Sequence, residues 1–184
     1  MIKIFFIYFF YFFSFNLYAD GIGSETDYKI PRFVSIKSND VNLRKGPSTN
    51  YPIVLKYTIK NLPVEIIEEY DLWRKIIDIN GNQGWIHKDL VKGDRFAIIN
   101  QNYNSPLQIK NKPQGRVIGT IGKNNIVKIE KCLLDWCAVS YENKKGWVEK
   151  NNLWGVYNYE KINIPFYQPL INKFWEIYNF LPIN

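Results

Sequence analysis

The chain has few of the side chains on which catalytic and metal sites depend. Its 184 residues include one histidine, His87, and two cysteines, Cys132 and Cys137. One cysteine pair cannot supply the four ligands of a tetrahedral zinc site. A cysteine nucleophile needs a neighbouring base, but His87 lies in a different half of the chain. No phosphate-binding glycine loop or dinucleotide fingerprint occurs. We therefore expect no cofactor, no metal and no enzymatic activity.

Carboxylates are the remaining catalytic alternative, because a group of them lies in the first half of the chain. General acid and base catalysis uses such side chains. Here they fall between two apolar runs, as in a solvated strand edge and turn, and we interpret them as structural. They are Glu65, Glu68, Glu69, Asp71 and Asp78.

The first 19 residues resemble a secretory signal peptide. A single charge, Lys3, precedes an uncharged apolar run from 4 to 13, and Ala19 is a small residue suited to cleavage. The run is shorter than the roughly 20 residues that a spanning helix needs. We predict cleavage after Ala19, with an uncleaved anchor as the alternative because Leu17 stands where a second small residue is preferred. The protein is expected to be exported, to the periplasm or cell envelope.

The net charge of +7 comes from lysines scattered along the chain rather than gathered in one stripe. An exported basic protein meets anionic lipid and acidic wall polymers before nucleic acid. We expect no nucleic-acid partner.

Two copies of one unit of about sixty residues make up most of the chain. At an offset of 63, Val64 aligns with Val127 and Trp73 with Trp136. Apolar residues alternate over short stretches separated by turn residues, as in antiparallel strands. The pattern predicts an all-β chain with two tandem barrels of five to six strands, over 33–94 and 95–157, that pack against each other.

Two local features extend this prediction. Asn80-Gly81 is typical of a type I′ hairpin turn. In the C-terminal extension, 158–184, apolar residues recur at three-and-four spacing and predict a short amphipathic helix. Its stripe of Phe174, Trp175, Tyr178 and Leu181 is expected to be buried against a barrel, a second chain or the membrane surface.

The two cysteines occupy positions that have counterparts in the first copy. Cys132 and Cys137 are close in sequence and lie in an exported chain, which favours a disulfide over free thiols. At the same offset the equivalent residues are Glu69 and Arg74, which carry opposite charges. Residues that flank a hairpin turn face each other across the strands. We predict a Cys132–Cys137 disulfide in one barrel and a Glu69–Arg74 ion pair in the other.

The run Val41-Asn42-Leu43-Arg44-Lys45-Gly46-Pro47-Ser48, followed by Gly84-Trp85-Ile86, resembles the bacterial SH3-like domain. The resemblance covers roughly 33–157, and the second copy departs from it at Gln108–Pro113, where its first loop is expected to be altered. It implies two SH3-like barrels in an exported envelope protein. Because relatives serve as targeting modules on wall-degrading enzymes, it also suggests peptidoglycan or a peptide as the ligand class.

Aromatic side chains are the candidate ligand-binding residues. Trp73 and Trp136 take equivalent places just after a turn, where they could form a platform for sugars or a peptide or pack in the barrel core. Tyr51 and Tyr57 are candidates for the same groove as Trp73.

Two functions follow from these features. The first is a non-enzymatic exported binding module for peptidoglycan or another envelope component. The alternative is a structural or adaptor protein in an envelope complex, acting through the barrels and the C-terminal helix. Peripheral membrane contact fits either, and the oligomeric state is left open.

Overall fold

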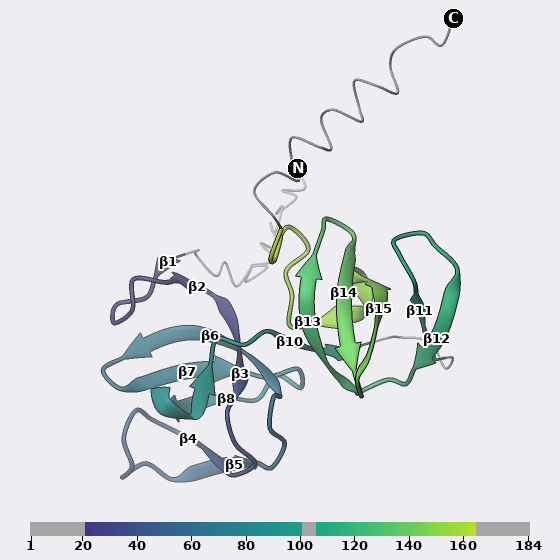
Figure 1. Ribbon diagram of the computed structural model, residues 1–184. Coiled ribbons are helices and arrows are strands. Elements are labelled where there is room, and N and C mark those ends of the chain that lie inside the picture. Colours follow the sequence, from purple (N-terminus) through teal and green to yellow (C-terminus); the bar gives the residue numbers. More distant parts are fainter. Residues whose placement is uncertain (1–20, 101–105, 165–184) are drawn as a thin grey trace, which may run out of the picture.

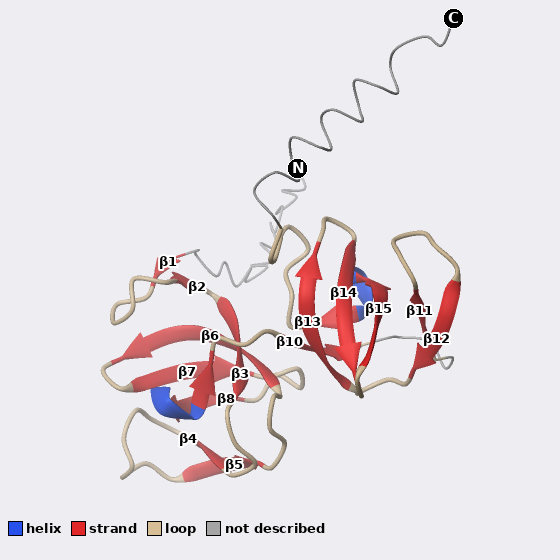
Figure 2. Cartoon of the chain, in the orientation of Figure 1, coloured by secondary structure: helices blue, strands red, loops and turns tan. Residues whose placement is uncertain are grey.

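The structure of the protein is a computed structural model that describes residues 21–100 and 106–164. Two β-units follow each other along the chain and lie side by side (Figure 1). The leader and the C-terminal helix predicted from the sequence lie outside the described residues. Within those residues the helical structure consists of two short 3-10 turns (Figure 2), and no helix is long and apolar enough to cross a membrane.

The first unit is a seven-stranded antiparallel sheet in the order β5-β4-β8-β7-β6-β3-β9. A small hairpin of β1 (Gly21–Ile22) and β2 (Lys29–Ile30) precedes it. The strands are β3 (Arg32–Ile36), β4 (Val41–Arg44), β5 (Ile53–Tyr57), β6 (Pro63–Tyr70), β7 (Trp73–Ile77), β8 (Gln83–His87) and β9 (Val91–Lys92), with the 3-10 turn η1 (Lys88–Leu90) between the last two. We call this sheet barrel 1.

The second unit, barrel 2, has the order β12-β11-β15-β14-β13-β10-β16. Its strands are β10 (Phe96–Ile99), β11 (Leu107–Lys110), β12 (Val117–Ile121), β13 (Ile126–Cys132), β14 (Trp136–Tyr141), β15 (Lys144–Glu149) and β16 (Leu153–Trp154), with the 3-10 turn η2 (Lys150–Asn152) before the last. Each strand corresponds to one in barrel 1, in the same order. The internal repeat inferred from the sequence is therefore a repeat of structure.

Both the strand count and the local irregularities repeat. Seven strands form each sheet, against the five to six expected, because β9 and β16 are two residues long and too short to show an alternating pattern. Bulges interrupt the pairing after Ile66 in β6 and after Ile129 in β13, which are equivalent at the offset of 63. A bulge increases the local bend and twist of a strand, so both copies bend at the same point.

Alternating residues of the strands form one buried core inside each barrel. In β4, Val41 and Leu43 are buried while Asn42 and Arg44 are partly exposed. Fully burying an aliphatic side chain contributes roughly 1.5–3 kcal/mol, so these small cores are the main source of stability. The aliphatic core of barrel 1 includes Ile36, Val64, Ile66, Ile76 and Ile86, and that of barrel 2 includes Ile99, Val127, Ile129, Val139 and Val148.

The turn at Asn80-Gly81 differs from the type I′ geometry expected. Gly81 has a positive φ of 82°, whereas Asn80 is not in the left-handed region. The carboxylate of Asp78 accepts hydrogen bonds from the N–H groups of Asn80 and Asn82, each at 2.9 Å. A side-chain acceptor therefore shapes this turn in place of a second left-handed residue.

The barrels pack against each other through aromatic rings, as expected. Phe33 of β3 meets Trp154 edge-on, with ring centroids 5.1 Å apart, and lies 4.7 Å from the ring of Tyr157. The Tyr157 hydroxyl donates a hydrogen bond to Glu65 of barrel 1 at 2.7 Å. This contact buries apolar surface that a small barrel alone would leave in water.

Candidate functional site

Trp136, at the start of β14, lies in a groove of about 670 Å³ on barrel 2. The side chain is partly buried and does not belong to the buried core cluster of this barrel. Its strand partner across the sheet is Glu149. The groove is lined by Lys110, Gln114, Leu134, Asp135, Trp136, Glu149, Lys150, Asn151 and Asn158.

The ammonium group of Lys110 lies over the ring of Trp136. The Lys110 ammonium lies 4.8 Å from the ring centroid, within the range of a cation–π interaction. Asp135 and Glu149 add two exposed carboxylates to the same groove. The groove therefore offers an aromatic face, charges of both signs and amide groups, which suits a polar ligand with an apolar or ring surface.

Lys150 closes one side of this groove and was not anticipated from the sequence. It is 2% exposed, and its ammonium donates hydrogen bonds to the carbonyls of Asn158 at 3.1 Å and Glu160 at 2.8 Å. Burial lowers the pKa of Lys150, against the opposing effect of Glu160. The equivalent residue of barrel 1, Lys88, is exposed, so the repeat carries no signal of this role.

Trp73 holds the equivalent place in barrel 1 but has a different neighbour. Its ring meets the imidazole of His87 edge-on, with centroids 5.5 Å apart. Like Trp136, it is partly buried and does not belong to the buried core cluster. Of the two interpretations of these tryptophans, the structure favours surface rings over core packing.

The two candidate tyrosines lie in different settings. Tyr51 is 46% exposed, and its ring covers Gly46, where an added β-carbon would come within 2.7 Å of it. Tyr57 is 6% exposed, and its hydroxyl donates to Asp78 at 3.1 Å. Burial, together with Asp78, raises the pKa of Tyr57 far above its ordinary value. The expectation that Tyr57 lines a surface groove with Trp73 is therefore corrected, because Tyr57 belongs to the core of barrel 1.

The sequence motif around Arg44 builds the loop that carries Tyr51. The Arg44 guanidinium donates to the carbonyls of Thr49 at 2.9 Å and Tyr51 at 2.8 Å. Barrel 2 has Lys110 at this place, and its ammonium lies over Trp136 instead. The first loop therefore differs between the two copies. Arg44 binds the loop carbonyls in barrel 1, whereas Lys110 contacts the ring of Trp136 in barrel 2.

Glu69 and Arg74 form the ion pair that the repeat alignment predicts. The two residues are partners across β6 and β7, with Arg74 Nε 3.4 Å from Glu69 Oε1. Both side chains are buried, although the sequence pattern placed Glu69 among the carboxylates of a solvated strand edge and turn. Arg32 of β3 is a second ion-pair partner of the same carboxylate, at 2.6 Å.

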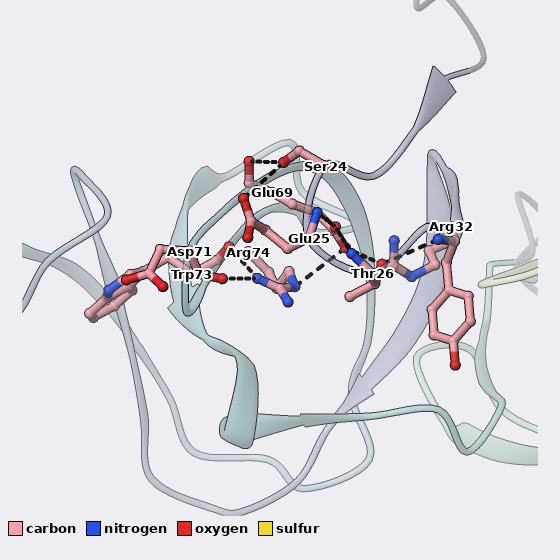
Figure 3. Close-up of polar contacts among 9 residues, drawn as sticks. Ser24, Glu25, Thr26, Arg32, Glu69, Asp71, Trp73 and Arg74 are labelled. Atoms are coloured by element: carbon pink, nitrogen blue, oxygen red, sulfur yellow. Dashed lines mark hydrogen bonds and ion pairs between the residues drawn. The ribbon is translucent and has the colours of Figure 1, made fainter.

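The N-terminal hairpin is the reason that this pair is buried. Glu69 accepts hydrogen bonds from the N–H groups of Glu25 and Thr26, each at 3.0 Å, and from the Thr26 hydroxyl at 2.8 Å (Figure 3). The loop between β1 and β2 thereby covers the end of the β6–β7 hairpin. No sequence signal pointed to this contact, because it joins residues more than forty positions apart.

The disulfide predicted between Cys132 and Cys137 is present, across the equivalent strands β13 and β14. Both cysteines are fully buried, and neither thiol is free. The backbone of Cys132 also pairs with Ile162 through hydrogen bonds of 3.0 and 3.1 Å. A segment that flanks the barrel therefore covers the same hairpin end in both copies. The disulfide suggests a compartment outside the reducing cytoplasm.

The described residues hold no group of three or more histidine, cysteine, aspartate or glutamate side chains that could bind a metal ion. The carboxylates considered above have structural partners in several cases. Glu69 binds arginines, Asp78 shapes a turn, Glu65 accepts from Tyr157 and Glu68 pairs with Lys75.

Comparison with solved structures finds matches at low sequence identity and low structural similarity. NlpC2 from Trichomonas vaginalis is 17% identical with a TM-score of 0.31, and the match covers 69% of this chain and 49% of that one. An NlpC/P60 family protein from Bacillus cereus is 13% identical with a TM-score of 0.30, covering 76% of this chain and 61% of that one. This chain thus spans about half to three-fifths of their length. Comparison with curated proteins gives no match.

The family model described as Bacterial SH3 domain matches the sequence twice, over residues 37–93 and 111–155. The two matches together cover more than half of the 184 residues, and they fall on the two sheets of repeated strand order. The chain belongs to the bacterial SH3 domain family, of which it carries two domains in tandem.

Proposed function

We propose that the protein is a non-enzymatic, exported binding module that recognises peptidoglycan or another component of the cell envelope. The observation that carries the proposal is the groove beside Trp136. A partly buried tryptophan outside the core, with a lysine ammonium over its ring, offers a face on which a sugar ring or a peptide group can stack. The buried disulfide fits a protein that folds in an oxidising compartment of the envelope.

The mixed charge of the groove also suits such a ligand. Stem peptides of peptidoglycan carry both amino and carboxyl groups, and the groove holds Lys110 beside Asp135 and Glu149. The groove of Trp136 lies on barrel 2, whereas the equivalent tryptophan of barrel 1, Trp73, packs against His87. We therefore place the principal ligand contact in barrel 2.

Co-sedimentation with purified sacculi tests this proposal. Replacing Trp136 by Ala should lower the retained fraction several-fold, and Trp136→Phe should keep part of it because a ring remains. Trp73→Ala is the matched control in barrel 1, since it removes the equivalent ring without touching the groove. Equal retention of the wild type and Trp136→Ala would contradict the proposal, provided that both proteins unfold at the same denaturant concentration.

A second function, that of a structural or adaptor protein in an envelope complex, is favoured by the outer strands. β5 and β12 are edge strands of the two sheets and expose aliphatic side chains at equivalent places. Val54 and Val117 are 61% and 46% exposed. An exposed edge can accept a strand from another protein. If this is the function, Val54→Lys and Val117→Lys together should abolish recovery of a protein partner from envelope extract and leave sacculus binding unchanged.

A further inference from the structure

A second groove, of about 590 Å³, lies on barrel 1 where the N-terminal hairpin and the link to barrel 2 come together. Its charged lining is predominantly basic. The basic side chains are Arg32, Arg74, Lys88, Lys92 and Arg95, and the acidic one is Asp89. We call it the basic groove. It is separate from the groove of Trp136, which lies on barrel 2.

The ion pairs around the basic groove leave a positive charge in excess. Arg32 and Arg74 share one carboxylate, that of Glu69, as Figure 3 shows. Lys88 is exposed and has no carboxylate partner among the described residues. Each of the other two bases has a carboxylate of its own, in the pairs Lys92–Asp94 and Arg95–Glu160. With Asp89 included, the bases exceed the carboxylates by one.

Two guanidinium groups of this groove also have unused donors. Arg32 Nη1 and Arg95 Nε are buried nitrogens without a hydrogen-bond partner. Buried donors are almost always paired, so each such exception calls for an acceptor. Arg32 comes from β3 and Arg95 from the link between the barrels, and both line the same groove. An oxyanion bound there would meet guanidinium groups from both segments.

Most of the remaining lining is apolar, which favours a ligand that carries an apolar group. Phe33, Val34, Ile66 and Val91 contribute side chains to the walls. Tyr28, which is 65% exposed, lies with its ring 5.4 Å from the Arg32 guanidinium carbon. A ligand that matches this lining combines one negative charge with a small apolar group.

We propose that the basic groove binds a carboxylate attached to a small apolar group, such as the C-terminal residue of a peptide with an aliphatic side chain. The unpaired Arg32 Nη1 and Arg95 Nε can each donate to one oxygen of a carboxylate, and the single excess charge matches a monoanion better than a phosphate dianion. This inference does not depend on the groove of Trp136. A carboxylate bound in the basic groove would contact both Arg32 of barrel 1 and Arg95 of the segment that leads to barrel 2.

NMR titration of the full chain with N-acetylalanine tests the proposal, because the Arg95 Nε–H group gives its own side-chain resonance. We expect a saturable shift of this resonance. The neutral N-acetylalaninamide, at the same ionic strength, should leave it in place. No saturable shift with N-acetylalanine would overturn the proposal, and tighter binding of methyl phosphate would overturn the assignment of a carboxylate.

A matched pair of surface variants supplies the second readout. Lys88→Gln removes the unpaired charge without disturbing the core, and affinity for N-acetylalanine should fall roughly two- to fivefold. Lys60→Gln removes an exposed lysine of the same barrel that does not line the basic groove, and affinity should not change. Equal affinities in the two variants would count against the proposed site.

Discussion

Glu69 and Arg74 face each other across β6 and β7 at the positions where Cys132 and Cys137 face each other across β13 and β14. One barrel joins the end of this hairpin by a buried ion pair and the other by a disulfide. In both barrels, a segment outside the barrel covers this cross-strand link. The loop after β1 binds Glu69 in barrel 1, and Ile162 pairs with Cys132 in barrel 2. The two copies thus use different chemistry for the same closure.

Removing the charge of Glu69 should destabilise barrel 1 strongly. Glu69→Gln leaves the buried guanidinium of Arg74 and that of Arg32 without a carboxylate. Breaking a buried pair on one side costs about 3–5 kcal/mol, which denaturant unfolding would measure. Glu68→Gln is the control, because its exposed pair with Lys75 should contribute no more than about 1 kcal/mol. Similar losses in the two variants would contradict the role given to Glu69.

The lowered pKa of Glu69 predicts how the free energy of unfolding depends on pH. Burial of Glu69 acts to raise its pKa, but hydrogen bonds from Arg32, Thr26 and the Glu25 N–H outweigh burial and hold the pKa below the ordinary value of 4.5. The unfolded chain therefore takes up this proton at a higher pH than the folded protein. The stabilisation is complete above about pH 4.5 and is lost as the pH falls through the folded pKa.

Unfolding free energies measured between neutral and acid pH would check this dependence. Glu69→Gln should flatten the curve below about pH 4.5, because the titrating group is gone. A curve for Glu69→Gln that runs parallel to the wild type across the acid range would show that other carboxylates cause the loss.

Reduction of the disulfide should act most strongly on barrel 2, at the end of the hairpin that the bond closes. Opening so short a loop costs roughly 2 kcal/mol by chain entropy, and the pairing of Cys132 with Ile162 should weaken with it. We expect hydrogen exchange to become faster at the Ile162 N–H after reduction, by a larger factor than at the amides of β6. Equal loss of protection in both barrels would contradict this local effect.

The sequence was sufficient for the repeat, the all-β architecture and the cross-strand pairs, because each of these follows from spacing along the chain. The alignment of Trp73 with Trp136 placed both rings at the start of equivalent strands. It could not show that Tyr57 turns inward to Asp78, since alternation alone does not say which face of an edge strand is buried.

Long-range contacts account for the other differences. The docking of Thr26 on Glu69 and the closure of the Trp136 groove by Lys150 both join segments whose pairing depends on the folded shape of the barrel. Lys88 and Lys150 occupy equivalent places, yet one is exposed and the other buried. The reason is that the C-terminal segment passes over barrel 2 and provides carbonyl acceptors there.

The contact between the barrels should couple their unfolding. Phe33 packs against Trp154 and Tyr157, so Phe33→Ala removes the ring that both partners share. Truncating a buried Phe costs about 3–5 kcal/mol, and we expect one thermal transition to become two. Tyr157→Phe, which loses its hydrogen bond to Glu65, should cost only about 0.5–1.5 kcal/mol and keep one transition. A single transition in Phe33→Ala would mean that the barrels are coupled by other contacts.

The most direct test of the proposed function is an NMR titration of the protein with soluble peptidoglycan fragments, read at the indole N–H resonances. The account predicts a saturable shift at Trp136, whose ring lies in the groove of barrel 2, and none at Trp85, which is 8% exposed. Trp136→Phe should remove the shifting resonance and weaken the binding of the fragments. An unchanged Trp136 resonance at fragment concentrations that shift other residues would contradict the assignment of this groove as the binding site.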